Sequence, residues 1–252
     1  NTSPPNNAFY NVDISEFNKP ITATYIVDEN KFNGSQNGVR LQNAINCRVT
    51  NNNIVIKRPL GGVFNAAIWL LYTDNTTVSD NILNCTPSQS KSWFTFGIFS
   101  GIASNNRYSC NTITGTGHCL KFQGASPVES VFRNSLNNNP SDPCIFGISL
   151  DNFGSTGSIE SPTGDAGNNI FGDFAYGLPY NGYDSWTQNN SNGSNIKYTG
   201  VSLPSNQYYP QFNSWDLILP GAPFTQSVVM TPPGPCFSNP KAKWRISEGI
   251  PP

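Results

Sequence analysis

The chain repeats one short pattern: an apolar residue, two further residues, an asparagine, one residue and a second apolar residue. Clear copies are Val49–Ile54, Val78–Leu83 and Tyr108–Ile113, and an alternating strand-like segment begins ten residues before each. The pattern predicts that one structural unit recurs along the chain. The asparagines that mark it are Asn30, Asn52, Asn81, Asn111, Asn134 and Asn168.

The spacing of these asparagines indicates a solenoid. Successive separations are 22, 29, 30, 23 and 34 residues, as expected for one coil with loops of variable length. A lone coil cannot bury its apolar residues, so neighbouring coils must stack with parallel strands. We therefore predict an all-β fold, a right-handed parallel β-helix of about six coils, with the asparagine side chains forming a hydrogen-bonded ladder at one corner.

Alternation within the strand-like segments predicts the core. The rival architecture, a β-sandwich, has strands at regular spacing but no such repeat. Charged residues are only 12% of the chain and 35 of its 252 residues are asparagine, a composition that favours turns over helices. The residues expected to point inward are Val39, Leu41, Ile68, Leu70, Ile98, Leu120, Phe122, Ile148 and Leu150.

The pattern divides the chain into three parts. Residues 1–19 are a lead-in or cap, residues 20–172 form the β-helix, and residues 173–252 are an irregular extension rich in aromatic residues and proline. Proline in this extension argues against long helices. We expect the extension to pack on the coils and cover the exposed end of the core. Alternatively, its aromatic rings form a sugar-binding surface.

Charge and cysteine content bear on partners and compartment. The net charge of −1 gives no electrostatic reason to bind nucleic acid, and the longest apolar run, Ala66–Tyr72, is too short to span a bilayer. The chain begins with Asn1 and shows no signal peptide, so we expect a mature or excised part of a longer protein. Disulfides in an oxidising compartment, or small buried thiols, are both compatible with Cys47, Cys85, Cys110, Cys119, Cys144 and Cys236.

The repeat units resemble those of a known superfamily. Val-Thr-Asn-Asn-Asn-Ile at Val49–Ile54 and its copies are similar to the parallel β-helix repeats of pectate-lyase-like proteins, most of all to NosD-like repeats of secreted or cell-surface proteins of Bacteroidota. The resemblance covers roughly residues 20 to 172. It implies the fold and an extracytoplasmic location, whereas activity varies widely on this scaffold.

Outward positions of the first strand of each coil form the candidate ligand-binding surface. One predicted column is Arg40, Trp69, Phe99, Lys121 and Ser149. The next column is Gln42, Leu71, Gly101, Gln123 and Asp151. From these columns we select Arg40, Trp69, Phe99, Lys121 and Asp151 as a surface suited to a glycan or a partner protein, unless the extension covers it.

No catalytic residue, metal ligand or cofactor motif is assigned. Lyases of this fold use a carboxylate cluster for Ca²⁺, and the two columns contain one carboxylate. Polygalacturonases use paired aspartates, but the chain has no Asp-Asp pair, and Gly117-His118-Cys119 only approaches their Gly-His-Gly motif. We expect His118 to be a solvated turn residue. A structural Ca²⁺ at Gly164–Asn168 remains an alternative to a metal-free chain.

Two functions follow from this sequence. The first is a non-enzymatic secreted or cell-surface module, a stalk or adhesin segment that binds a glycan or another surface protein. The second is a polysaccharide lyase or glycoside hydrolase whose carboxylates lie in the long insertions near Pro87–Trp93, Asn137–Pro143 and Ser155–Asp165. Retention of glycan without turnover favours the first function, and turnover favours the second.

Overall fold

The chain forms stacked parallel β-strands and, within the residues described, no helix. The structure is a computed structural model. It describes residues 10–15, 24–57, 64–85, 94–124, 130–136, 144–151, 169–171, 183–187, 196–200, 213–214 and 224–228. Sequence analysis placed possible loop carboxylates or Ca²⁺ on four segments that lie outside these ranges: Pro87–Trp93, Asn137–Pro143, Ser155–Asp165 and Gly164–Asn168.

Three parallel sheets make the body of the molecule. Sheet 1 contains, in spatial order, β1 (Tyr10–Ser15), β4 (Asn37–Gln42), β7 (Asn65–Leu71), β10 (Thr95–Gly101), β13 (His118–Gln123), β16 (Phe146–Asp151), β18 (Tyr183–Thr187) and β20 (Asn213–Ser214). Sheet 2 contains β2 (Ile26–Asp28), β5 (Arg48–Thr50), β8 (Thr77–Ser79), β11 (Arg107–Ser109) and β14 (Ser130–Phe132). Sheet 3 contains β3 (Lys31–Ser35), β6 (Asn53–Ile56), β9 (Ile82–Cys85), β12 (Thr112–Thr114), β15 (Ser135–Leu136) and β17 (Ile170–Phe171).

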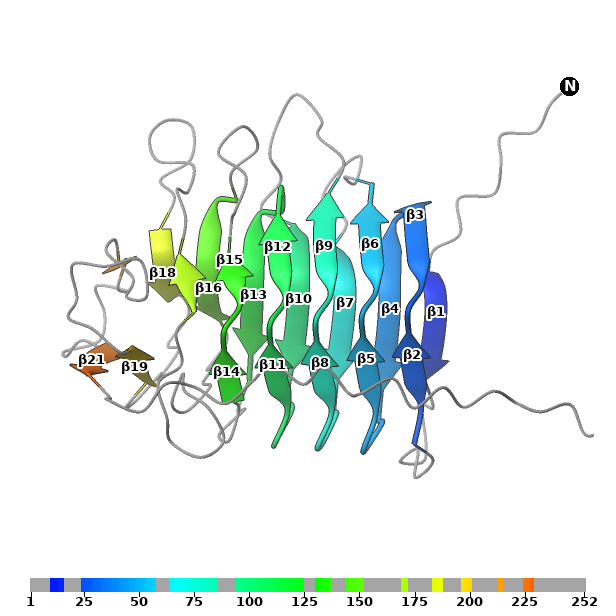
Figure 1. Cartoon of the computed structure of the whole chain (residues 1–252), viewed down its shortest axis with the longest axis horizontal. Coiled ribbons are helices and arrows are strands. Elements are labelled where there is room, and N and C mark those ends of the chain that lie inside the picture. The colour runs from blue at the N-terminus through cyan, green and yellow to red at the C-terminus, as the bar shows by residue number, and fades with distance from the viewer. Residues whose placement is uncertain are drawn as a thin grey trace, which may run out of the picture.

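The path of the chain through these sheets confirms the predicted β-helix. Each turn contributes one strand to each sheet, from β1–β2–β3 to β13–β14–β15, and β16 and β17 continue a further turn. In Figure 1 the strands of sheets 2 and 3 run upward in front, those of sheet 1 run downward behind, and successive turns advance to the left, which is a right-handed winding. β19 (Ile196–Gly200) and β21 (Phe224–Val228) form a separate parallel pair.

The corners of each coil are made by single residues in the left-handed backbone region. One corner column consists of Glu29, Asn51, Asp80, Cys110 and Arg133, each with φ between 54° and 59°. Asparagine and aspartate tolerate this conformation better than other non-glycine residues because their short side chains bond nearby backbone. The abundance of asparagine in the sequence therefore reflects, in part, the backbone demands of the corners, since Asn46, Asn75 and Asn105 form a second such column.

The core lies between the three sheets and follows the predicted pattern. Val39, Ile68, Leu120 and Ile148 are fully buried in one column of sheet 1. Val49 and Val78 line sheet 2, and Ile54 and Leu83 line sheet 3. All nine residues expected to point inward belong to one continuous hydrophobic cluster. Stacking thus removes from water the apolar side chains that one coil alone would expose.

A ladder of asparagine side chains runs along the corner between sheets 2 and 3. From Asn52 onward, each ladder oxygen accepts from the backbone N and from Nδ2 of the asparagine one coil earlier, as Asn81 Oδ1 does from Asn52 at 3.0 Å each. Each Nδ2 from Asn52 onward also donates to a carbonyl oxygen of the preceding coil, such as Asn81 Nδ2 to Val49 O at 2.8 Å. The members are Asn30, Asn52, Asn81, Asn111, Asn134 and Asn169.

The final member of the ladder corrects the sequence analysis by one residue. Asn169 Oδ1, not that of Asn168, accepts from Asn134 Nδ2 at 2.9 Å, and Asn168 lies outside the described residues. The pairing of Leu136 with Phe171 explains the shift. Phe171, two residues after Asn169, occupies the apolar position of the pattern, whereas the sequence analysis gave that position to Ile170.

The stacked strands extend beyond the boundaries expected from the sequence. β1 belongs to residues 1–19, yet it pairs with β4 in register as the first strand of sheet 1. β18 lies after residue 172 and pairs with β16, so sheet 1 continues into the segment expected to be an irregular extension. Among the residues described, no helix has the length and apolarity needed to cross a membrane.

Candidate binding surface on the outer face of sheet 1

The outer face of sheet 1 carries the two predicted columns in the predicted register. Arg40 pairs with Trp69, Trp69 with Phe99, Phe99 with Lys121 and Lys121 with Ser149. The second column runs from Gln42 through Leu71, Gly101 and Gln123 to Asp151. The structure therefore brings the five selected residues Arg40, Trp69, Phe99, Lys121 and Asp151 onto one face.

The burial of this face varies along the axis, a point that sequence analysis left open. Phe99 and Lys121 are each 6% exposed and Ser149 is fully buried. Arg40, Trp69 and Asp151 are half-buried. Ligand access to the predicted columns is therefore greatest at β4 and β7, because the aromatic and basic groups at β10 and β13 are largely removed from solvent.

Aromatic rings form a continuous band across β7 and β10, which we define as Phe64, Trp69, Phe94, Phe96 and Phe99. Ring centroids lie 5.2 Å apart for Phe64 and Phe94, 5.9 Å for Phe64 and Phe96, 5.5 Å for Phe96 and Phe99, and 4.9 Å for Trp69 and Phe99. These distances are typical of favourable ring packing. The middle of the band is buried, whereas Phe64 and Phe94 are 50% and 40% exposed.

Arg40 provides a positively charged border beside Trp69. Its guanidinium lies 3.6 Å from a carboxylate oxygen of Asp13, donates to Gln42 Oε1 and sits 5.3 Å from the ring centroid of Tyr10. These contacts hold the side chain in place although it is partly exposed. The indole Nε1–H of Trp69 is buried and has no acceptor among the described residues. This end of the face thus combines an aromatic surface with fixed hydrogen-bonding groups.

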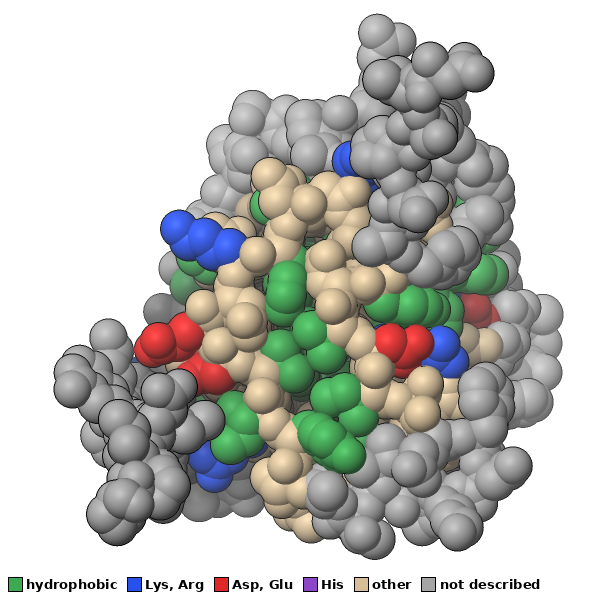
Figure 2. Space-filling model, turned by 90° about the vertical axis from the view of Figure 1, so that its right-hand side faces the viewer, with side chains coloured by type: hydrophobic (Ala, Val, Ile, Leu, Met, Phe, Trp, Pro, Cys, Tyr) green, Lys and Arg blue, Asp and Glu red, His purple; other side chains and the backbone are tan. Residues whose placement is uncertain are grey.

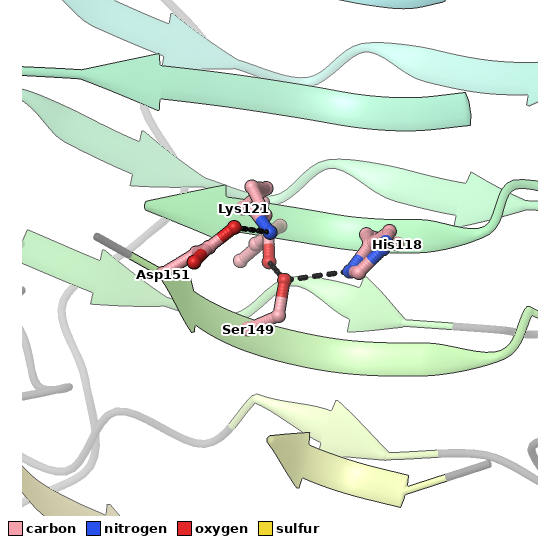
Figure 3. A network of polar contacts seen from close by, with 5 residues as sticks. His118, Lys121, Ser149 and Asp151 are labelled. Atoms are coloured by element: carbon pink, nitrogen blue, oxygen red, sulfur yellow. Dashed lines mark hydrogen bonds and ion pairs between the residues drawn. The ribbon is translucent and has the colours of Figure 1, made fainter. Parts of the chain in front are cut away.

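His118 begins β13 and is buried, so the expectation of a solvated turn residue was wrong. Its ring is 2% exposed and lies between Phe96 and Phe146, at centroid distances of 5.2 and 4.7 Å. His118 Nδ1 is 2.8 Å from Ser149 Oγ, and Ser149 Oγ donates to Leu120 O at 3.3 Å (Figure 3). With its proton directed to Leu120, the Ser149 hydroxyl accepts from the ring and is not activated as a nucleophile.

Lys121 and Asp151 form an ion pair beside this histidine. Nζ lies 2.9 Å from Asp151 Oδ2, and both side chains are directed toward each other in Figure 3. Burial lowers the pKa of Lys121, and the charge of Asp151 opposes that change. The ion pair with Asp151 fixes the position of the ammonium group. Sequence analysis found both residues but not their pairing, because neighbouring columns do not specify side-chain direction.

The signal that aligns His118 with aromatic residues of the neighbouring strands was present in the sequence, although strict alternation would have placed its side chain inward. His118 precedes the core residue Leu120 by two positions, as Phe96 precedes Ile98 and Phe146 precedes Ile148. Extending the predicted strands by two residues would have put the histidine in an aromatic column. Within the described part of the chain, no three His, Cys, Asp or Glu side chains are grouped to hold a metal ion.

Comparison with known proteins finds no matching family model, no matching curated protein and no matching solved structure.

Proposed function

We propose that this chain is a non-enzymatic, secreted or cell-surface β-helix module that binds a glycan on the outer face of sheet 1. The observation that carries the proposal is the aromatic band, whose rings are fixed by the stacked strands beneath them and whose ends are accessible. Flat aromatic rings stack on the apolar faces of sugars as they stack on one another. Resemblance of the repeats to secreted pectate-lyase-like and NosD-like proteins supports the same location.

Rigidity of the face supports binding without chemistry. The ladder and the parallel strands hold the aromatic band in one geometry, so little conformational entropy is lost when a ligand binds. Arg40 supplies a partly exposed cationic donor next to Trp69, from which sugar hydroxyl or carboxylate oxygens would accept hydrogen bonds. A rigid platform with fixed donors is the arrangement expected of a binding module or adhesin segment.

A glycan-binding assay with substituted aromatic residues tests this proposal. The chain is applied to a panel of neutral and uronic-acid polysaccharides by affinity electrophoresis, alone and with Trp69→Ala or with Phe64→Ala and Phe94→Ala together. We expect each change to weaken retention roughly three- to tenfold, because one or two stacking surfaces are lost. Tyr25→Ala, which removes an aromatic residue 37% exposed and outside the band, is the matched control. Equal retention of all variants would contradict the proposal.

The alternative function, a polysaccharide lyase or glycoside hydrolase, is favoured by one feature: the buried Lys121 beside Asp151, whose lowered pKa suits proton transfer. The same polysaccharide panel is followed for unsaturated products and new reducing ends. The chain would be an enzyme if it degrades a polysaccharide, if Lys121→Met abolishes that degradation and if Trp69→Ala leaves it measurable. Retention without turnover supports the module.

An extracytoplasmic location predicts that Cys110 takes part in a disulfide. Cys47, Cys85, Cys119 and Cys144 are buried free thiols, as one of the two sequence interpretations expected, and Cys110 is not among them. Alkylation of the unfolded chain without reductant is therefore expected to label these four free thiols, and prior reduction should add two further sites. Labelling of all six cysteines without reductant would argue against an oxidising compartment.

A further inference from the structure

The β1–β3 end of the β-helix presents three sheet edges and apolar side chains together. β1, β2 and β3 are the terminal strands of sheets 1, 2 and 3. Val12, Ile14 and Phe32 are only partly buried against the core at this end. Figure 2 shows hydrophobic side chains gathered in the centre of this face and charged side chains around them. Terminal strands with unpaired backbone groups are templates for pairing with another chain.

The asparagine ladder is also incomplete at this end. Asn30 donates to Asn52 Oδ1 from its backbone N and from Nδ2, at 3.0 and 3.1 Å. At the interior positions of the ladder, each asparagine Oδ1 accepts two hydrogen bonds. The Oδ1 of Asn30, in contrast, has no donor among the described residues. Asn30 is half-buried, so this oxygen marks an open acceptor at the centre of one edge of the end face.

Opposite charges flank that open position. Glu29 precedes Asn30 on the side of sheet 2, and Lys31 follows it as the first residue of sheet 3. Both side chains are exposed, and neither forms an ion pair within the described part of the chain. A twofold axis through Asn30 would exchange the two sheets and so place Glu29 of one molecule opposite Lys31 of a second.

We propose that two copies of this chain associate head to head through their β1–β3 ends, around a twofold axis that passes through Asn30 and the middle of β1. In Figure 1, β2 and β3 lie end to end in front of β1, so this axis runs from the front of the end face to its back. It pairs β1 with β1 of the second copy in antiparallel orientation, and β2 with the second copy's β3. The partly buried Val12, Ile14 and Phe32 of both copies meet in the centre.

This arrangement provides partners for the sheet edges, the apolar residues and the exposed charges of the end face together. The sheet edges gain backbone partners, the apolar residues leave water, and two Glu29–Lys31 pairs form across the axis. An isologous contact of this type closes after two copies, because it uses the β1–β3 end of both. It is independent of the proposed glycan surface, which lies on the outer face of sheet 1.

Charge reversal tests the twofold arrangement. Sedimentation velocity over a range of concentrations gives the dimer dissociation constant of the unchanged chain, of Glu29→Lys, of Lys31→Glu, and of the two changes combined. We expect each single change to raise the constant on the order of tenfold, because two attractive pairs become repulsive. The combined change should restore it, since each pair is reversed but still opposite in sign. Arg48→Glu, an exposed charge reversal one coil away, is the control.

A residue on the axis gives a second measurement. Asn30→Cys should form an intermolecular disulfide under mild oxidation, because the two copies of residue 30 face each other, whereas Asn33→Cys, exposed but away from the axis, should not. A chain that stays monomeric at every concentration overturns the proposal. So does a combined charge reversal that weakens association as much as the single changes do.

Discussion

Asn81 illustrates how much of the structure depends on single side chains. Its Oδ1 accepts from Asn52 N and Nδ2, and its Nδ2 donates to Val49 O and Asn111 Oδ1, at 2.8 to 3.0 Å. All of these groups are buried between coils, where water cannot replace a missing partner. An aliphatic residue of similar size would leave each of them unsatisfied.

Replacement of Asn81 by alanine should therefore be costly. We expect Asn81→Ala to lower the free energy of unfolding by about 3 kcal/mol, because several buried polar groups lose a partner at once. Asn33→Ala, an exposed asparagine in β3, should change it by less than about 0.5 kcal/mol. Urea denaturation of the two variants makes the comparison. Equal stability would show that the ladder contributes no more than a surface asparagine.

Asp80 occupies the corner position that Asn51 occupies one coil earlier. Its backbone has φ 59°, and its Oδ2 is buried with no hydrogen-bond partner in the described part of the chain. Burial raises the pKa of this carboxyl, and a hydrogen bond with Ser79 acts in the opposite direction. A raised pKa in the folded state means that ionisation of Asp80 opposes folding, so its contribution to stability falls as pH rises above the ordinary value of 3.8.

Asp80→Asn should stabilise the chain at neutral pH. The amide suits the left-handed corner and carries no charge, and we expect a gain of about 0.5–1 kcal/mol at pH 7. The gain should shrink as pH falls toward and below 3.8, where Asp80 is protonated in both folded and unfolded chains. Urea midpoints at neutral and acidic pH measure it. A gain that does not depend on pH would exclude the buried charge as its cause.

At the scale of the element, the strands of sheet 1 depart from strict alternation. Cys119 and Leu120 are consecutive residues of β13, yet both belong to the core cluster, whereas His118 and Lys121 lie on the outer face. In β10 the equivalent inward pair is Gly97 and Ile98. A side chain at position 97 would lie 2.7 Å from Cys119 O and against Ile113 Cγ2. The strand therefore requires glycine there.

Two alanine substitutions in β10 separate this requirement from a general cost of replacing glycine. Gly97→Ala should lower the free energy of unfolding by about 2 kcal/mol, because its methyl group meets backbone and a buried side chain. Gly101→Ala meets only the ends of the Leu71 and Phe99 side chains, at 2.9 and 3.0 Å, which can move, so a cost below about 1 kcal/mol is expected. Denaturant unfolding distinguishes them, and equal costs would contradict the proposed close approach.

Sequence pattern predicted the register of the outer face but not its environment. The columns through Arg40 and Gln42 follow from alternation, since residues at equivalent strand positions must stack when coils do. Burial of Lys121 and His118 does not follow, because strict alternation does not predict that the consecutive residues Cys119 and Leu120 both face the core. The one-residue difference between Asn168 and Asn169 has a similar cause: two adjacent asparagines fit the pattern, and only strand pairing selects one.

At the scale of the whole molecule, stability is distributed along the axis. Each coil contacts its two neighbours through three sheets and the ladder, so the stack behaves as a series of similar interfaces. Such a body is long, stiff and tolerant of loops of different length, which accounts for the variable separations between ladder asparagines. These mechanical properties suit the surface module that we propose.

The coil-to-coil register is tested most directly by paired cysteines on the exposed side of sheet 3. Asn53 and Ile82 are exposed partners on neighbouring strands, and Ile82 in turn pairs with Thr112 on the next strand. Neighbouring strands lie about 4.8 Å apart, so a disulfide can link them. Alternate strands lie at about twice that distance, which a disulfide cannot bridge. The account predicts that Asn53→Cys with Ile82→Cys oxidises to an intramolecular disulfide, located by peptide mass spectrometry, whereas Asn53→Cys with Thr112→Cys does not. Failure of the first pair, or bridging of the second, would contradict the stacked β-helix.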